Sequence, residues 1–127
     1  MKQIARLLVG LIGTASLLMA LALWFNMEAF VPQLGIETVS PVGRATVRAD
    51  IAGLFMGIGI MMVMAAWKSS SAWAYGALVL VGGAIAGRLV GVAADGAGPG
   101  IWPPIIVEAV AIAILLWART VWKSASN

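Results

Sequence analysis

Apolar residues form four long runs in this chain, separated by short segments that carry most of the polar and charged side chains. The runs cover residues 4–25, 47–67, 72–94 and 102–122. A helix needs about 20 apolar residues to cross the hydrocarbon core of a bilayer, and each run is long enough to do so. The pattern therefore predicts an all-α membrane protein in which a single domain, residues 1–127, forms a four-transmembrane-helix bundle.

The segments between the runs predict how consecutive helices are joined. The second and third runs are separated by "KSSS", which is so short that these two helices must be antiparallel neighbours. The segment "DGAGPGIWPP" is a turn by composition, and Pro103 and Pro104 suit the first turn of the fourth helix, where a missing N–H costs nothing. The longest connection, residues 26–46, has room for a short interfacial helix near residues 29–34.

The composition indicates that lipid is the solvent for much of the surface. Hydrophobic residues make up 62% of the 127 residues and charged residues only 10%, whereas about a quarter of a soluble domain is charged. The chain therefore has too few polar side chains to cover a surface that faces water. The net charge of +3 is small and scattered, without a basic patch that carries interleaved aromatics, so no nucleic-acid partner is expected.

Two residue types that carry much of enzyme chemistry are absent from the sequence. The chain has no cysteine, which excludes disulfides, thiol chemistry and thiolate metal sites. It also has no histidine, which is the usual nitrogen ligand of metals and the usual proton shuttle at neutral pH. We therefore expect no metal site and no cofactor, and an enzyme is less favoured than a protein that binds or assembles.

Charges and tryptophans together predict the orientation of the helices. Five basic residues fall on one side of the membrane, and all five acidic residues fall toward the other. Positively charged flanks stay in the cytoplasm, so both termini are expected there. Tryptophan favours the headgroup level, and the six tryptophans fall at the same two boundaries. The inner set is Lys2, Arg6, Lys68, Arg119, Lys123, Trp67, Trp73, Trp117 and Trp122, and the outer set is Glu28, Glu37, Asp50, Asp95, Glu108, Trp24 and Trp102.

The first run also has a second interpretation. Lys2 and Arg6, followed by an apolar run and the small residues "ALA" at 20–22, fit a cleavable signal peptide as well. The apolar run from Leu7 to Phe25 is long for such a peptide, and this length favours a membrane-spanning helix.

An arginine and a glutamate interrupt the third and fourth runs at matching depth. Arg88 and Glu108 each lie six residues, or about 9 Å, inside the outer boundary on antiparallel helices. An isolated charge at this depth is costly, and pairing with a carboxylate offsets much of that cost. Asp50 and Asp95 are expected to join them, because each shares a helix face with the bundle interior or with Arg88. The sequence therefore predicts a buried Arg/carboxylate cluster in the outer half of the bundle.

Glycines at helical spacing predict where helices pack closely, because they let another backbone approach. Two such sets are present: Gly53 with Gly57, and Gly83 with Gly87 and Gly91. Arg44 and Arg48 share a different face of the second helix, and we expect them to reach lipid phosphates.

Three segments resemble a known family in their order and spacing. They are "RADIAGLFMG" at the start of the second run, "AGRLVGVAADG" at the end of the third and "IVEAV" in the fourth. The chain resembles the short four-helix proteins of the bacterial inner membrane known as domain of unknown function 4345, and more distantly the DoxX and DoxD proteins. The resemblance implies a multi-pass protein of that membrane and no activity. The pattern falls on Arg48, Asp50, Gly53, Arg88, Gly91, Asp95, Gly96 and Glu108.

Two classes of function fit these features, and membrane lipids are partners in both. The first is a binding module in which the charged cluster holds the head of a lipid or another small amphipathic molecule. The second is an accessory or structural subunit of a larger membrane complex, in which the glycine faces contact another membrane protein or a second copy of the chain. An enzyme comes third, because two carboxylates and an arginine permit acid–base chemistry but no nucleophile points to a reaction.

Overall fold

The computed structural model describes residues 1–37 and 40–123, and within these residues it contains helices and no strand. Four helical segments are long and apolar enough to cross a membrane, with bounds Lys2–Phe25, Pro41–Lys68, Ser71–Asp95 and Trp102–Lys123. The protein is therefore an all-α, multi-pass membrane protein, as the run pattern predicts. Its helices are α1 (Lys2–Phe25), α2 (Met27–Phe30), η1 (Val31–Leu34), α3 (Pro41–Thr46), η2 (Val47–Ile51), α4 (Ala52–Lys68), α5 (Ser71–Asp95) and α6 (Trp102–Lys123).

The second span begins earlier than its apolar run predicts. The backbone N–H of Gly43 donates to Ser40 Oγ at 3.0 Å, and Pro41 occupies the first turn, so the helix starts with a complete cap. It continues without a break through the π-helical turn η2 into α4, and the span therefore covers Pro41–Lys68. The short interfacial helix expected near residues 29–34 corresponds to α2 and η1.

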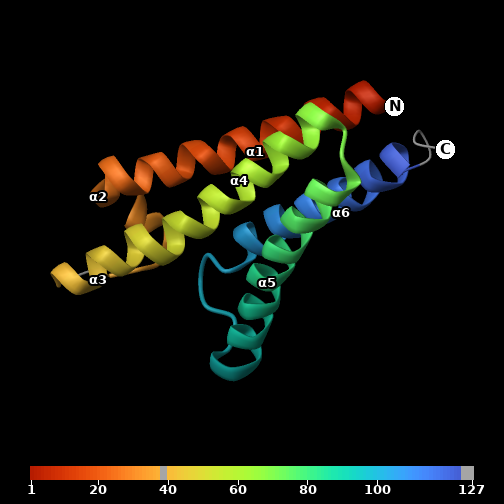
Figure 1. Cartoon of the computed structure of the whole chain (residues 1–127). Helices are drawn as coiled ribbons and strands as arrows, with labels where there is room; N and C mark the ends of the chain where they lie inside the picture. Colours follow the sequence, from red (N-terminus) through yellow and green to blue (C-terminus); the bar gives the residue numbers. More distant parts are fainter. Residues whose placement is uncertain (38–39, 124–127) are drawn as a thin grey trace.

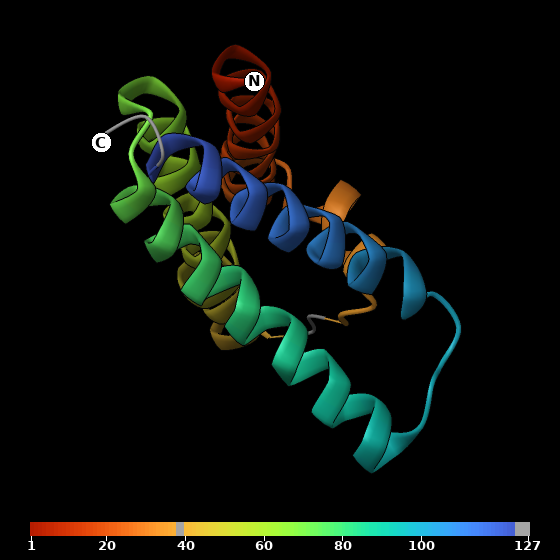
Figure 2. The same ribbon diagram turned by 90° about the vertical axis from the view of Figure 1, so that its right-hand side faces the viewer.

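The four long helices pack in a ring. Helix α1 contacts α4 and α6, and α5 contacts the same two helices from the other side. Figure 1 shows α1 and α4 running alongside each other, whereas α5 departs from them toward its C-terminal end. In Figure 2, α5 and α6 diverge toward residues 96–101, which join them. The ring is therefore closed at one end and open at the other.

The bundle has two halves, which we name by their charges. The basic half contains the end with Lys2, Arg6, Lys68, Arg119 and Lys123, and the acidic half contains Glu28, Glu37, Asp50, Asp95 and Glu108. A core built from all four long helices fills the basic half. The core of the acidic half is built from α1, α2, η1, η2 and α4, without any residue of α5 or α6. This asymmetry leaves a space between the two cores.

Helices α1 and α4 come closest at two glycines that face each other. A Cβ on Gly13 would lie 2.8 Å from the Met62 Cβ, and a Cβ on Gly59 would lie 2.9 Å from the carbonyl oxygen of Gly13. Real side chains do not tolerate such distances, so only glycine permits this crossing. The close approach therefore falls at Gly59 rather than at Gly53 or Gly57.

Candidate functional site

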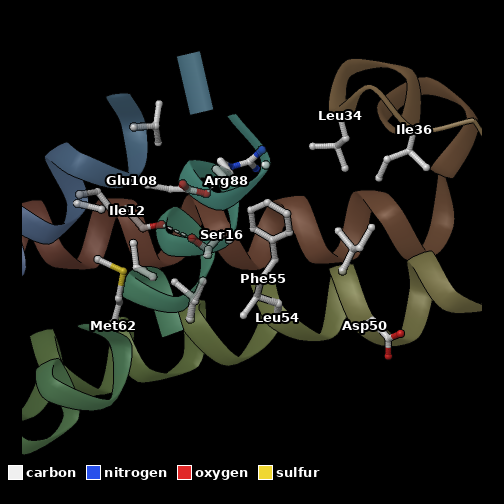
Figure 3. A pocket seen from close by; sticks show the side chains of 18 of the residues that line it. Ile12, Ser16, Leu34, Ile36, Asp50, Leu54, Phe55, Met62, Arg88 and Glu108 are labelled. Carbon is white, nitrogen blue, oxygen red and sulfur yellow. Dashed lines mark hydrogen bonds and ion pairs between the residues drawn. The ribbon is translucent and has the colours of Figure 1, made fainter. Parts of the chain in front are cut away.

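A cavity of about 580 Å³ lies between the two cores and is walled by all four long helices and by the segment after η1. Its wall is largely apolar, with Phe55 and Met62 from α4 and Ile12 from α1 (Figure 3). Ile58 of α4 also lines it. Three charged residues also line it, and they are Asp50, Arg88 and Glu108. The cavity is therefore an apolar space with a small number of polar groups.

Arg88 and Glu108 meet at the cavity wall. The Arg88 Nε–H donates to Glu108 Oε1 at 2.9 Å, and the two side chains are 32% and 15% exposed. Arg88 lies seven residues before the end of α5 and Glu108 six residues after the start of α6, so the antiparallel packing of these helices brings them level. The structure thus places together the pair that the matching depths predict, and Figure 3 shows the two side chains side by side.

The predicted buried cluster is wrong in two respects. No charged residue is buried anywhere in the described part of the chain, and Arg88 and Glu108 are half-buried. Asp50 and Asp95 are exposed and join neither partner. Asp50 lies near the rim of the cavity, and its carboxylate points away from Arg88 (Figure 3).

The reasons for these two errors differ. Asp50, Gly53 and Leu54 do share a helix face, but this face is exposed and lies at the rim of the cavity, because α1 packs against α4 at Gly59 instead. Asp95 is the last residue of α5, two turns or about 10 Å beyond Arg88 along the axis. That distance is too long for an ion pair within one helix.

Two polar groups of the pair have no hydrogen-bond partner within the described residues. Glu108 Oε2 is buried, yet it has no hydrogen-bond partner in residues 1–37 and 40–123. The terminal nitrogens of Arg88 likewise make no hydrogen bond within those residues, since only its Nε is engaged. The Ser16 hydroxyl, which also lines the cavity, donates to the Ile12 carbonyl oxygen at 3.1 Å, as is common in membrane helices. The site therefore offers an unused acceptor beside unused donors.

The glycines of α5 shape the cavity. Gly87 and Gly91 line it, and apart from their chain neighbours and the backbone of their own helix no heavy atom lies within 4 Å of the position that a Cβ would occupy on either residue. The same open space surrounds Gly53 and Gly83, while a Cβ on Gly57 would meet only the Leu80 side chain, at 3.4 Å. Within this chain these glycines therefore bring no helix backbone close, and their role in helix packing stays a prediction about contacts with other chains.

The two arginines at the start of the second span have partners within the protein. Both terminal nitrogens of Arg44 donate to Glu28 Oε1 at 3.3 Å. Arg48 Nε–H donates to the Trp24 carbonyl oxygen at 3.3 Å, and the Trp24 indole N–H donates to the Arg48 carbonyl oxygen at 3.0 Å. These contacts join α2 to α3 and the end of α1 to η2.

Several features of the site have no clear signal in the sequence. The contact between Gly13 and Gly59 involves one glycine from each of two apolar runs, and neither run shows a regular stripe there. Phe55 lines the cavity, but nothing in its sequence context separates it from other apolar residues of the second run. Within the described residues no group of three acidic residues is placed to hold a metal ion.

Comparison with known proteins gives one match. The family described as Domain of unknown function (DUF4345) matches residues 4–119, a segment that includes the cavity and both members of the Arg88–Glu108 pair. No curated protein and no solved structure matches the chain. The more distant likeness to the DoxX and DoxD proteins therefore stays a prediction.

Proposed function

The chain belongs to the DUF4345 family, and we propose that it binds one small, neutral, amphipathic molecule in the cavity between its four long helices. The observation that carries this proposal is the position of the Arg88–Glu108 pair in the wall of an apolar cavity, where the buried Glu108 Oε2 lacks a hydrogen-bond partner within the described residues. Buried acceptors are nearly always paired, so a donor from outside the chain accounts for it.

The size and lining of the cavity suit a lipid-like tail. Pockets that enclose small ligands measure about 300–1,000 Å³ and are mostly apolar, and 580 Å³ lies inside that range. Ile12, Ile58 and Met62 supply apolar contacts from two helices, and the flexible thioether of Met62 adapts to an irregular chain. The tail would then occupy the space that Gly87 and Gly91 leave open.

The charges favour a neutral head that both donates and accepts hydrogen bonds. The lining carries one cation, Arg88, and two carboxylates, Glu108 and Asp50, so an anionic head would add a third negative charge. A hydroxyl can instead donate to Glu108 Oε2 while a neighbouring oxygen accepts from the Arg88 guanidinium. This arrangement satisfies both unused groups without bringing a net charge into a region of low dielectric.

The proposal also gives the protein a place and an orientation. We infer residence in the bacterial inner membrane with both termini in the cytoplasm, because the five basic residues of the basic half lie at the end that holds the termini. The cavity lies in the acidic half, so the ligand head would sit in the outer leaflet. This placement rests on the charge pattern of the helix ends.

The experiment compares three probes that share one acyl chain. Monolauroylglycerol carries donors and acceptors, methyl laurate carries acceptors alone, and laurate carries a negative charge. A hydrogen bond to a charged group contributes about 1.5–3 kcal/mol, so the glycerol ester should bind at least about tenfold more tightly than the other two. Native mass spectrometry of the protein in mild detergent measures the bound fraction of each.

Glu108→Gln is the matched variant for this experiment. The amide oxygen can still accept from Arg88, but the amide nitrogen replaces the unused acceptor with a donor. The preference for monolauroylglycerol should therefore disappear while the fold is retained. Equal binding of all three probes to the unaltered protein, or an unchanged preference in the variant, would contradict the proposal.

The alternative function is that of an accessory or structural subunit. Gly83 supports it, because this exposed residue of α5 lies outside the cavity and has no heavy atom within 4 Å of its Cβ position. A helix of another membrane protein, or of a second copy of the chain, can approach there. The same mass spectrum tests this alternative, since a subunit would appear with a protein partner and without any bound probe.

A further inference from the structure

The basic half carries positive charge that no acidic side chain of the described residues neutralises. Its five cationic side chains belong to α1, to the last residue of α4 and to α6. All five acidic side chains belong to the acidic half, and both ion pairs in the described residues, Arg44–Glu28 and Arg88–Glu108, lie there too. The basic half therefore favours an anion from outside the chain as its counter-ion.

Neutral groups hold the cations of this half in place. Arg6 Nε–H donates to the Ala66 carbonyl oxygen at 3.0 Å, near the C-terminal end of α4. The Lys68 ammonium lies 5.9 Å from the centroid of the Trp73 ring, and the Arg119 guanidinium 4.9 Å from that of the Tyr75 ring. These contacts orient the side chains and leave their positive charge uncompensated.

Arg6 lines a groove of about 570 Å³ between α1 and α4, on the surface of the bundle. Gly10 and Thr14 follow Arg6 along the groove at four-residue spacing, so small side chains form its floor. Leu7, Leu11 and Val63 add apolar contacts, and Trp67 lies at the mouth with 73% of its surface exposed. The groove thus begins at a cation and an interfacial tryptophan and continues along apolar residues.

We propose that this groove binds one anionic phospholipid. The phosphate group accepts hydrogen bonds from the terminal nitrogens of Arg6, which have no partner within residues 1–37 and 40–123, and an acyl chain lies along Gly10 and Thr14. A zwitterionic lipid carries a phosphate too, but its own ammonium group neutralises that negative charge, so the lipid is a poor counter-ion for the basic half. The site is separate from the cavity that contains Arg88 and Glu108, so either assignment can fail without the other.

Trp67 provides a local probe for the experiment. The full-length protein is reconstituted into vesicles that contain a small fraction of brominated phosphatidylglycerol or, in parallel, brominated phosphatidylcholine. Bromine quenches the fluorescence of a nearby indole. The fluorescence of Trp67 is obtained as the difference between the unaltered protein and the Trp67→Phe variant. We expect half-maximal quenching of Trp67 at a fraction of brominated phosphatidylglycerol about fivefold lower than that of brominated phosphatidylcholine. This is the factor by which one cation near the membrane surface favours an anionic lipid.

Arg6→Gln and Lys2→Gln form the matched pair, because each removes one positive charge from the first turns of α1 and only Arg6 lines the groove. Arg6→Gln should abolish the preference, whereas Lys2→Gln and the charge-preserving Arg6→Lys should retain it. Native mass spectrometry of the unaltered protein, which requires no variant to fold, should show phosphatidylglycerol retained in preference to phosphatidylcholine, and excess inorganic phosphate should not displace it. The proposal would be overturned if both lipids quenched Trp67 equally or if phosphate displaced the bound lipid. It would also be overturned if Arg6→Gln and Lys2→Gln lost the preference to the same extent.

Discussion

Small residues occur in both halves of the bundle, but the helices that carry them pack closely in one half and separate in the other. In the basic half, completely buried alanines lie where helices meet, and they are Ala5, Ala65, Ala74, Ala77 and Ala118. In the acidic half, α5 carries three glycines at four-residue spacing, yet no buried residue of α5 lies beyond Val81. Small side chains therefore permit close packing but do not cause it.

The connections between helices account for the difference. Helices α4 and α5 are joined by Ser69 and Ser70 alone, and Ser69 adopts a left-handed conformation with φ of 49° that reverses the chain. Such a short link holds two helix ends together and lets alanines close the gap. Helices α5 and α6 are joined by residues 96–101, a link long enough for their ends to separate. The cavity lies at the separated end.

The largest effect is expected where backbones touch, and Gly59→Leu tests this. The new side chain would collide with Leu17 and with the backbone of Gly13, so α1 and α4 must move apart. We expect the free energy of unfolding to fall by about 3 kcal/mol, which is the upper end of the range for overpacking. The change is measured as a lower thermal unfolding temperature in detergent. Gly83→Leu is the matched control, because open space surrounds Gly83, and equal unfolding temperatures for the two variants would contradict the packing described here.

An intermediate effect is expected for Arg88→Leu, which probes the open half. The change leaves the Glu108 carboxylate without its cation and without its hydrogen-bond donor. Because Arg88 is about one third exposed, we expect the free energy of unfolding to fall by only about 1–2 kcal/mol. The double variant Arg88→Leu with Glu108→Leu should recover most of this stability by removing the stranded charge. The single variant Glu108→Leu completes the cycle, in which thermal unfolding measures the stability of all three variants. Additive losses of stability would show that the pair does not interact.

The smallest effect on stability is expected for Gly87→Leu, which fills the cavity. No atom lies near the Cβ position of Gly87, and leucine favours the helix over glycine, so stability should change by less than about 1 kcal/mol. Binding of monolauroylglycerol should nevertheless fall by at least about tenfold, as native mass spectrometry can measure. Gly83→Leu should bind normally, and a Gly87→Leu protein that binds as well as the unaltered chain would rule out the cavity as the ligand site.

Much of the fold is predictable from local sequence properties. Each run of about 20 apolar residues specifies a membrane-spanning helix without reference to the others, because lipid requires every backbone group to bond within its own helix. The contact between Arg88 and Glu108 is also predictable, since equal distances from a tight turn bring two residues level on antiparallel helices. The helix of the second span extends beyond its apolar run, because Ser40 and Pro41 start it six residues earlier.

The composition of the site is less predictable. The two glycines on its face predict an interior position for Asp50, but the rotation of α4 depends on where α1 packs. The spacing of the α5 glycines predicts a contact surface, although within this chain they border open space. Helix rotation and divergence depend on several helices at once, so no pattern within one helix reveals them.

The sequence by itself determined the four spans, their antiparallel order, the segregation of charge and the partnership of one arginine with one glutamate. These features depend on hydropathy, connection length and distance along a helix, which are local quantities. Only the tertiary structure decided which face of each helix turns inward, where α1 and α4 touch, and that α5 leans away to open a cavity. These features arise from packing among all four helices, where a glycine is equally compatible with a close contact and with an empty space.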